Sequence, residues 1–269
     1  MQDDELRELI EFAGKLADDA RAVILPHFRS PLDIANKKND GKFDPVTIAD
    51  REAEQSIRSL ISKTYPAHGI LGEEFGALES SNGLTWCIDP IDGTRAFIMG
   101  VPQWGVLIAL HDGAAPVLGI MDQPFTGERF TGSRLGASVS RNGKSTPLRT
   151  RACAALQDAI LTTTHPDAFG KKSEHDAYLR VAAQTRMHRY GGDCYSYAML
   201  AHGLIDLVVE TDLKPYDIQA LIPIITAAGG VITNWRGGPA DQGGQVIAAG
   251  DARLHAAALE ILKGDADWK

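Results

Sequence analysis

Apolar and polar residues along the chain first follow the period of a helix and later that of short strands. From residue 3 to about residue 28, apolar side chains recur every three or four positions with charged residues between them. This spacing predicts an amphipathic helix that ends at Pro26 and the pair Ser30-Pro31. The spaced apolar residues are Leu6, Leu9, Ile10, Ala13, Leu16, Ala17 and Ala20.

A second helix is expected over residues 49–64, where apolar residues again recur at helical spacing. Thr47, followed three residues later by Asp50, resembles a capping arrangement at the start of this helix. Between the two helices, the sequence Asn-Asp-Gly at residues 39–41 indicates a turn.

Beyond Gly83, short apolar runs bounded by turn residues replace the helical pattern. Residues 104–110 and 116–121 flank the sequence His-Asp-Gly, which predicts a hairpin, and Asn142-Gly143 marks another turn. The remaining predicted strands are residues 86–89, 159–163, 186–190, 206–210, 230–235 and 245–249, and the remaining helices are 194–202, 218–228 and 252–263. This mixed order favours an α/β fold with layered packing rather than a helix bundle or an all-β barrel.

Composition narrows the class of protein. The 269 residues include 27 Lys+Arg and 35 Asp+Glu, a formal net charge of −8, which argues against nucleic acid or an anionic membrane as partner. The three cysteines form no CxxC pair, and the chain starts with acidic residues where a signal peptide would be basic, so a cytoplasmic protein is expected. No long linker interrupts the chain, and a single domain over residues 1–269 is expected.

The candidate chemistry lies where the predicted strand over residues 86–89 runs into two carboxylates. Pro90 cannot donate to a sheet ladder, so the strand is expected to stop there. The chain would then expose Asp89, the Ile91 carbonyl and Asp92 together. Oxygen ligands without His or Cys suit a hard cation such as Mg²⁺.

Gly93 and Thr94 follow directly and open a predicted short helix. Free backbone N–H groups at a helix start attract an anion. Metal ligands beside an anion site are typical of phosphoryl transfer. The alternative is that Asp-Pro and Asp-Gly are ordinary solvated turn sequences.

The whole stretch resembles the signature of the inositol monophosphatase family, a family of Mg²⁺-dependent, Li⁺-sensitive phosphatases. The matching residues are Trp86, Ile88, Asp89, Pro90, Ile91, Asp92, Gly93, Thr94 and Phe97. Three further motifs are similar to those of the family: Asp-Pro-Val-Thr-x-Ala-Asp at 44–50, Gly-Ile-Leu-Gly-Glu-Glu at 69–74, and Lys-Pro-Tyr-Asp at 214–217 followed by Ala-Ala-Gly-Gly at 227–230.

The resemblance implies a layered αβαβα sandwich of mixed α+β character. Its N-terminal half, residues 1–145, would carry the metal motifs. Its C-terminal half, residues 146–269, would carry the specificity residues and the last metal ligand. The resemblance also implies a homodimer.

The resemblance further implies two to three Mg²⁺ ions, with Mn²⁺ able to substitute and Li⁺ able to inhibit. Glu73, Asp89 and the Ile91 carbonyl would hold one ion, and Asp89, Asp92 and Asp217 a second. A third, more weakly bound ion would be held by Glu73 and the phosphate. Carboxylates gathered around a phosphate repel it and one another strongly, so divalent cations are needed to offset the repulsion. Asp217 is alternatively an N-cap before Ile218.

The implied reaction is hydrolysis of a phosphomonoester by direct attack of a metal-activated water. Thr94, paired with Asp50, would position the water and help take its proton, and Glu73 completes the expected catalytic residues. Asp50 is alternatively only a cap for its helix. The expected substrate-binding residues are Asp92, Gly93, Thr94, Arg189, Asp193, Glu210 and Asp217.

Within the family, three segments look like the histidinol-phosphate phosphatase branch: residues 94–105, Arg-Tyr-Gly-Gly-Asp-Cys-Tyr at 189–195, and Leu-Lys-Pro-Tyr-Asp at 213–217. Histidinol phosphate carries a cationic amine and an imidazole, whereas inositol is neutral, and Asp193 and Glu210 are suited to accept hydrogen bonds from such groups. Asp193 is alternatively a helix cap before Cys194. Arg189 would contact the phosphate or pair with an acid of a partner subunit.

The expected function is therefore Mg²⁺-dependent hydrolysis of histidinol phosphate, a step of histidine biosynthesis. One alternative is an inositol-1-monophosphatase or a broad small-sugar phosphatase. A more distant alternative is a non-catalytic relative that binds a phosphorylated metabolite.

Overall fold

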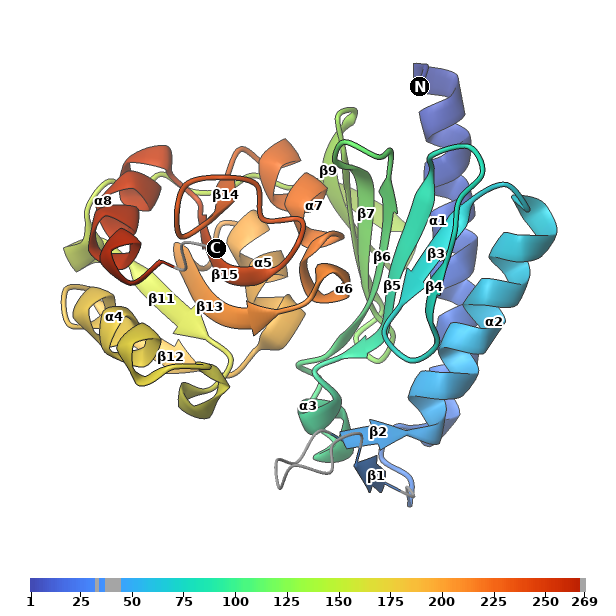
Figure 1. The fold of residues 1–269 in the computed structure, drawn as a ribbon, viewed down its shortest axis with the longest axis horizontal. Helices are drawn as coiled ribbons and strands as arrows, with labels where there is room; N and C mark the ends of the chain where they lie inside the picture. Colours follow the sequence, from blue (N-terminus) through green and yellow to red (C-terminus); the bar gives the residue numbers. More distant parts are fainter. Residues whose placement is uncertain (32–33, 37–44, 267–269) are drawn as a thin grey trace.

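Two β-sheets and three layers of helices alternate in the structure, a computed structural model that describes residues 1–31, 34–36 and 45–266. Helices α1 and α2 cover one face of the first sheet, α5, α6 and α7 lie between the sheets, and α4 and α8 cover the outer face of the second (Figure 1). The expected αβαβα sandwich is therefore confirmed.

The helices have the following bounds: α1 (Asp3–Ile24), α2 (Ile48–Thr64), α3 (Thr94–Ile98), α4 (Lys172–Ala182), α5 (Asp193–Ala201), α6 (Pro215–Ile218), α7 (Leu221–Ala227) and α8 (Ala252–Leu262). Short 3₁₀ helices are η1 (Leu25–His27), η2 (Leu156–Asp158), η3 (Pro166–Ala168) and η4 (Lys263–Asp265).

The first sheet has eight strands in the order β10-β9-β8-β7-β6-β5-β3-β4, and the second has five in the order β12-β11-β13-β15-β14. The strands of the first sheet are β3 (Gly69–Gly72), β4 (Gly76–Leu78), β5 (Thr85–Asp92), β6 (Gly105–His111), β7 (Pro116–Gln123), β8 (Glu128–Ser133), β9 (Gly136–Arg141) and β10 (Lys144–Pro147). Those of the second are β11 (Ile160–Thr163), β12 (Met187–Tyr190), β13 (Leu207–Leu213), β14 (Val231–Asn234) and β15 (Gly244–Ala249). A separate pair joins β1 (Ile34–Asn36) to β2 (Pro45–Thr47).

Both predicted N-terminal helices are confirmed, with their ends set by local chemistry. The first α-helix ends at Ile24, and Pro26 lies in the 3₁₀ turn that follows. At the start of α2, the Thr47 side chain accepts from the Ala49 N–H, and the Asp50 carboxylate accepts from the Thr47 N–H at 2.8 Å. The turn predicted at 39–41 lies outside the described residues.

The strand carrying the candidate acids does not stop at Pro90, as the sequence analysis expected. It continues to Asp92, and its register against β6 shifts between Asp89 and Asp92. The bulge places one extra residue opposite the partner strand, so the missing N–H of Pro90 falls where the ladder is already interrupted.

Two other predictions from the sequence were incomplete. The helix expected over residues 218–228 corresponds to α7, which begins only at Leu221, and Ile218 ends the separate short helix α6. Helix α4 was not predicted, although its buried apolar residues Ala177, Tyr178, Val181 and Ala182 recur at helical spacing.

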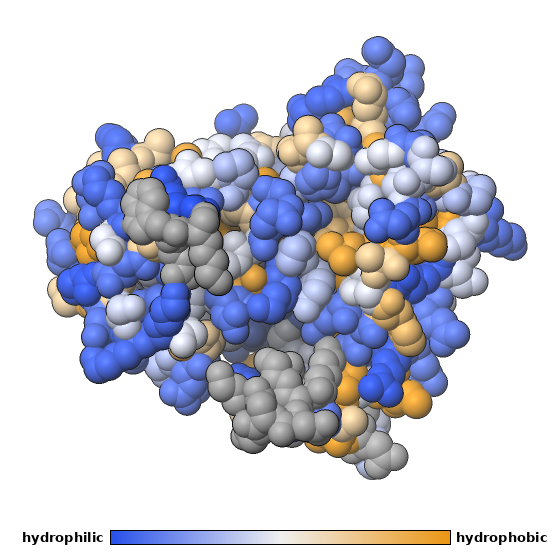
Figure 2. Space-filling model, viewed as in Figure 1, coloured by the Kyte–Doolittle hydropathy of each residue, from blue (hydrophilic) through white to orange (hydrophobic). Residues whose placement is uncertain are grey.

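The face shown in Figure 2 is largely hydrophilic, with small scattered apolar patches. None of the helices in the described residues is long and apolar enough to cross a membrane.

The inner helices pack against the first sheet through apolar side chains and, at two glycines, through direct backbone contact. A Cβ added to Gly119 of β7 would lie 1.9 Å from the Ala220 carbonyl oxygen. A Cβ added to Gly132 of β8 would lie 2.3 Å from the Cα of Ile224 in α7. Glycine at these two positions therefore lets the C-terminal elements approach the sheet closely enough to bury a shared apolar core.

We predict that Gly132→Ala lowers the free energy of unfolding by about 2–3 kcal/mol, because overpacking a tight contact forces the backbone apart. Urea unfolding followed by circular dichroism measures the change. Gly14→Ala is the matched control, since a Cβ there meets only Arg129 Nη1 at 3.5 Å, and alanine favours the interior of α1. Equal stability of the two variants would contradict the packing argument.

Candidate active site

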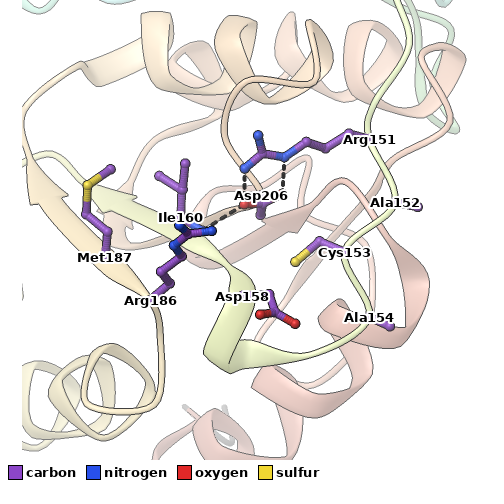
Figure 3. A pocket seen from close by; sticks show the side chains of 9 residues that line it. All are labelled: Arg151, Ala152, Cys153, Ala154, Asp158, Ile160, Arg186, Met187 and Asp206. Carbon is purple, nitrogen blue, oxygen red and sulfur yellow. Dashed lines mark hydrogen bonds and ion pairs between the residues drawn. The ribbon is translucent and has the colours of Figure 1, made fainter.

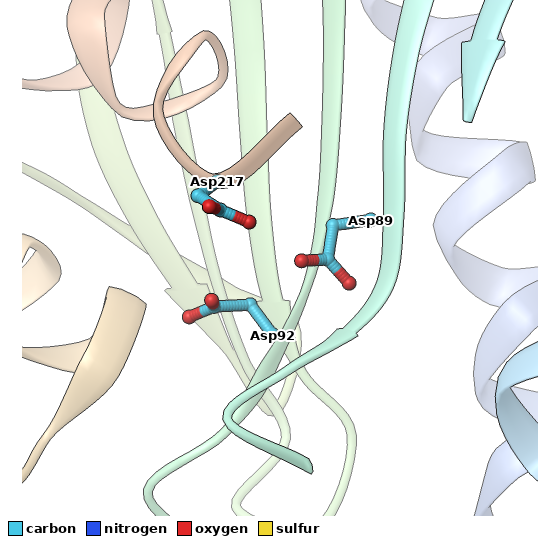
Figure 4. Close-up of side chains that lie close together, drawn as sticks. All are labelled: Asp89, Asp92 and Asp217. Atoms are coloured by element: carbon cyan, nitrogen blue, oxygen red, sulfur yellow. The ribbon is translucent and has the colours of Figure 1, made fainter. Parts of the chain in front are cut away.

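Three carboxylates from both halves of the chain meet beside the bulge of β5. Asp89 and Asp92 come from β5, and Asp217 comes from α6 (Figure 4). One carboxylate oxygen of each lies within 4.8 Å of one from each of the others. Such a set of hard oxygen donors fits a cation such as Mg²⁺.

A backbone N–H group fixes each of these carboxylates. Asp89 accepts from the Ile91 N–H at 3.0 Å, and Asp92 accepts from the Cys194 N–H at 2.6 Å. The Asp217 carboxylate accepts from the Lys214 N–H at 2.7 Å. The N-cap of α6 is Lys214 and Asp217 is the third residue of the helix, so the N-cap position considered for Asp217 is wrong. Its carboxylate bonds back to the N-cap backbone and lies in the acidic cluster at the same time.

Burial and mutual repulsion raise the pKa values of these carboxyls. The pKa of Asp89 is raised by burial first and then by Glu73, Asp92 and Asp217, and that of Asp92 by burial and then by Asp193 and Asp217. Burial is also the largest cause that raises the pKa of Asp217 to about 7.

Glu73 lies next to this cluster, at the end of β3. Its carboxyl adds to the rise in the pKa of Asp89. A bound divalent cation would stabilise the charged forms of these carboxyls. The donor chemistry of the site thus fits the Mg²⁺ expected from the sequence.

Thr94 and Asp50 also lie together. The Thr94 hydroxyl is 3.5 Å from Asp50 Oδ1 and donates to the Ile91 carbonyl at 3.0 Å. Asp50 Oδ2 accepts from the N–H and the hydroxyl of Thr47. The helix cap and the contact with Thr94 therefore use different oxygens of one carboxylate, and the Ile91 carbonyl keeps a second lone pair for another partner.

A cleft of about 340 Å³ opens above these residues, with walls from both halves of the chain. Its lining includes Glu73, Asp92, Gly93, Thr94, Asp193, Glu210 and Asp217. Most residues that the sequence analysis assigned to a site therefore lie around one space.

Glu210 forms the buried wall of this cleft on the side of the second sheet. Its Oε1 accepts from the Thr164 N–H at 2.9 Å and from the Thr164 hydroxyl, and its Oε2 accepts from the Tyr197 hydroxyl at 2.9 Å. Burial raises the pKa of Glu210, although these donors oppose the shift.

Asp193 lies near Glu210 at the start of α5. Burial is the main cause that raises the pKa of Asp193 to about 7, and Glu210 adds to the shift while Arg95 opposes it. The residue has a left-handed φ of 43° and is the first residue of the helix, after the N-cap Gly192. The prediction that Asp193 caps this helix is therefore wrong.

Arg189 lies apart from the other candidates. It belongs to β12, an edge strand of the second sheet, and its side chain is exposed. Among the described residues, Arg189 is not one of those that line the cleft.

Two residues that hold Glu210 were missed in the sequence. Tyr197 lies in the helix predicted over residues 194–202, but nothing in that pattern pairs it with Glu210. Thr164 is 46 residues from Glu210 along the chain, and no local pattern pairs them.

A second cavity, of about 590 Å³, lies at the opposite ends of β11 and β13 (Figure 3). Its main feature is the buried Asp206, which accepts from Arg151 Nε and from the Ile160 N–H, both at 2.7 Å. None of the site residues expected from the sequence lines it. This ion pair joins the segment before β11 to the start of β13.

Comparisons with known proteins agree with the motifs. The model of the inositol monophosphatase family matches residues 5–264. The chain is 42% identical to the bifunctional phosphatase IMPL2 of Arabidopsis thaliana, over 98% of this chain and 77% of that protein. It is 36% identical to a histidinol-phosphatase of Chlorobaculum parvum, over 85% of this chain and 86% of that protein. A solved inositol monophosphatase from Zymomonas mobilis has a TM-score of 0.84 at 42% identity, covering 96% of this chain and 98% of that one.

We predict that the metal-free protein loses stability as the pH rises through the range of the clustered carboxyls. The pKa of Asp217 is about 7 in the folded state and ordinarily 3.8, so its contribution is complete below the lower value and is lost as pH approaches the upper one. Each proton that folding retains changes the free energy of unfolding by about 1.4 kcal/mol per pH unit.

Urea unfolding in a chelator, at a series of pH values across this window, measures the slope. Asp217→Asn should flatten it, and Mg²⁺ should restore stability at the alkaline end, because the cation replaces the protons. Stability that rises with pH in the chelator would contradict the prediction.

Proposed function

The chain belongs to the inositol monophosphatase family and is a phosphatase, and from that premise we propose that it hydrolyses histidinol phosphate with Mg²⁺ as its cofactor. The observation that carries this proposal is the pair of additional acids, Asp193 and Glu210, in the wall of the cleft. These acids are distinct from the cluster formed by Asp89, Asp92 and Asp217.

The two sets of acids have different consequences for the ligand. Divalent cations would neutralise the cluster and so admit a phosphate. Asp193 and Glu210 would remain. Burial raises the pKa of both and so disfavours their charged forms, and Glu210 adds to the shift at Asp193. A leaving group with a cationic amine or imidazolium would relieve that penalty, whereas a neutral polyol would not.

The relatives support the same substrate class. Besides the protein of Chlorobaculum parvum, the sequence comparisons include proteins named histidinol-phosphatase at 34% and 32% identity. The inositol monophosphatase from Zymomonas mobilis, at 42% identity, favours a second candidate function, hydrolysis of inositol monophosphate.

In the proposed reaction, the residues of the chain orient the substrate and move one proton. Bound Mg²⁺ would lower the pKa of a water and neutralise phosphate oxygens. Asp89, Asp92, Asp217 and Glu73 would hold the cation. The Thr94 hydroxyl would turn from the Ile91 carbonyl toward Asp50 Oδ1, 3.5 Å away, accept the proton of the attacking water and pass its own proton to Asp50. As the water oxygen bonds to phosphorus, the bond from phosphorus to the leaving-group oxygen would break, and that oxygen would take a proton from solvent. The Gly93 and Thr94 amides would bind the phosphate.

We predict that Asp89→Asn lowers Mg²⁺-dependent phosphate release by about a thousandfold or more, because it removes charge from the centre of the metal site. Circular dichroism should show an unchanged fold. Unfolding in a chelator should show higher stability than the wild type, since one repelling carboxyl is gone. Near-normal turnover in this variant would overturn the assignment of the site.

Substrate choice is tested by phosphate release from histidinol phosphate, inositol monophosphate, fructose bisphosphate and adenosine 3′,5′-bisphosphate. We expect histidinol phosphate to have the highest kcat/KM. Preference for inositol monophosphate would remove the substrate claim and leave the mechanism. Metal binding without release from any ester would indicate a non-catalytic, metabolite-binding protein.

We predict that Glu210→Gln lowers kcat/KM for histidinol phosphate by about tenfold or more, the cost of losing one charged hydrogen bond, and changes that for inositol monophosphate much less. Glu128→Gln is the matched control: Glu128 also accepts from a tyrosine, Tyr195, at 2.6 Å, but lies outside the described cleft lining. An equal loss of kcat/KM for both substrates would show that Glu210 does not discriminate by the charge of the leaving group.

A further inference from the structure

We propose that Glu54 is a positioning residue for the metal site: with Arg58 it holds the turn that presents the Glu73 carboxylate to the cation. This inference rests on the proposed Mg²⁺-dependent function. It concerns two residues of α2 that belong to none of the sequence motifs and that do not line the cleft among the described residues.

Glu54 is a fully buried carboxylate that binds the backbone of the turn between β3 and β4. Its Oε2 accepts from the Glu74 N–H at 2.7 Å, and its Oε1 accepts from the Phe75 N–H at 3.2 Å. The two amides are the ones that directly follow Glu73. Hydrogen bonds to an ionised acceptor are about twice as strong as neutral ones, so this carboxylate fixes the backbone beside the metal ligand.

Arg58 completes the clamp from the next turn of the same helix. Its Nε donates to Glu54 Oε1 at 2.7 Å, and its Nη2 donates to the Gly76 carbonyl. The pair therefore holds both ends of the turn. Glu54 accepts from the backbone N–H groups of the turn, and Arg58 donates to a backbone carbonyl of the turn. Both partners bury most of their side chains, with 0% of Glu54 and 17% of Arg58 exposed.

The backbone before Glu73 is shaped to receive this carboxylate. A Cβ added to Gly72 would lie 1.9 Å from Glu54 Oε1, closer than any side chain allows. On its other side, the Glu73 N–H donates to the Ile88 carbonyl of β5 at 3.3 Å. Glu73 thus lies between α2 and β5 on a backbone fixed on both sides, and its carboxyl is near enough to raise the pKa of Asp89.

Apolar packing does little to hold this turn. All three residues of β4 are exposed, and Phe75 keeps 50% of its surface exposed. The turn is therefore held by the pairing of β3 with β4 and by the hydrogen bonds to Glu54 and Arg58. The same face of α2 carries Asp50 one turn earlier, also fully buried, so one rigid helix would position both Glu73 and the partner of Thr94.

The test compares Glu54→Gln with Asp206→Asn in Mg²⁺ binding by isothermal titration calorimetry, without substrate. Asp206 is a matched control, because it is also a fully buried carboxylate that accepts from an arginine and a backbone N–H, far from the cleft. Each amide variant turns an NH₂ group toward a donor and should lower the melting temperature. Only a positioning residue should also change metal affinity.

We expect Glu54→Gln to raise the dissociation constant for Mg²⁺ by about tenfold or more, and Asp206→Asn to leave it within about twofold. Arg58→Gln, which alters a partly exposed partner and spares the buried carboxylate, should weaken Mg²⁺ binding by a smaller factor; it decides the question if Glu54→Gln does not fold.

Wild-type Mg²⁺ affinity in Glu54→Gln, or in Arg58→Gln where only that variant folds, would overturn the positioning role while leaving the proposed function in place. A wild-type protein that neither binds Mg²⁺ nor releases phosphate would overturn the proposed function itself, and this inference with it.

Discussion

Mutual repulsion among three carboxylates, one buried and two half-buried, is the constraint on which the rest of the site depends. Asp89, Asp92 and Asp217 place oxygens within 4.8 Å of one another, in surroundings that raise the pKa of each. Unlike charges at such distances would stabilise the fold, but like charges must take up protons or a cation. This repulsion therefore lowers the free energy of unfolding, and a bound divalent cation would offset the loss.

Holding that space open requires rigid neighbours. Asp217 reaches the cluster only because the inner helices approach the first sheet through Gly119 and Gly132, where no side chain intervenes. Asp89 and Asp92 face it from a bulged strand anchored between β3 and β6. Backbone N–H donors then fix one oxygen of each carboxylate, so repulsion cannot simply rotate the side chains apart.

The sequence predicted those parts of the molecule whose signals are local. Helix period located α1 and α2, the Thr47–Asp50 pair located a cap, and the Asp-Pro-Ile-Asp-Gly-Thr motif located the acids. Prediction failed where distant contacts decide. The strand continues past Pro90 because the partner strand accommodates a bulge, and Thr164 meets Glu210 only because β11 and β13 are paired neighbours.

The division of the cleft between the two halves bears on how such an enzyme acquires its substrate preference. The residues proposed for phosphate chemistry, apart from Asp217, come from the first sheet and α2 and α3. The wall that would meet the leaving group comes from Asp193 and Glu210, on α5 and β13. Because Glu210 is held by Thr164 and Tyr197 of its own half, changes in that wall need not disturb the metal ligands. A charge placed there can select the leaving group while the machinery for the phosphate stays the same.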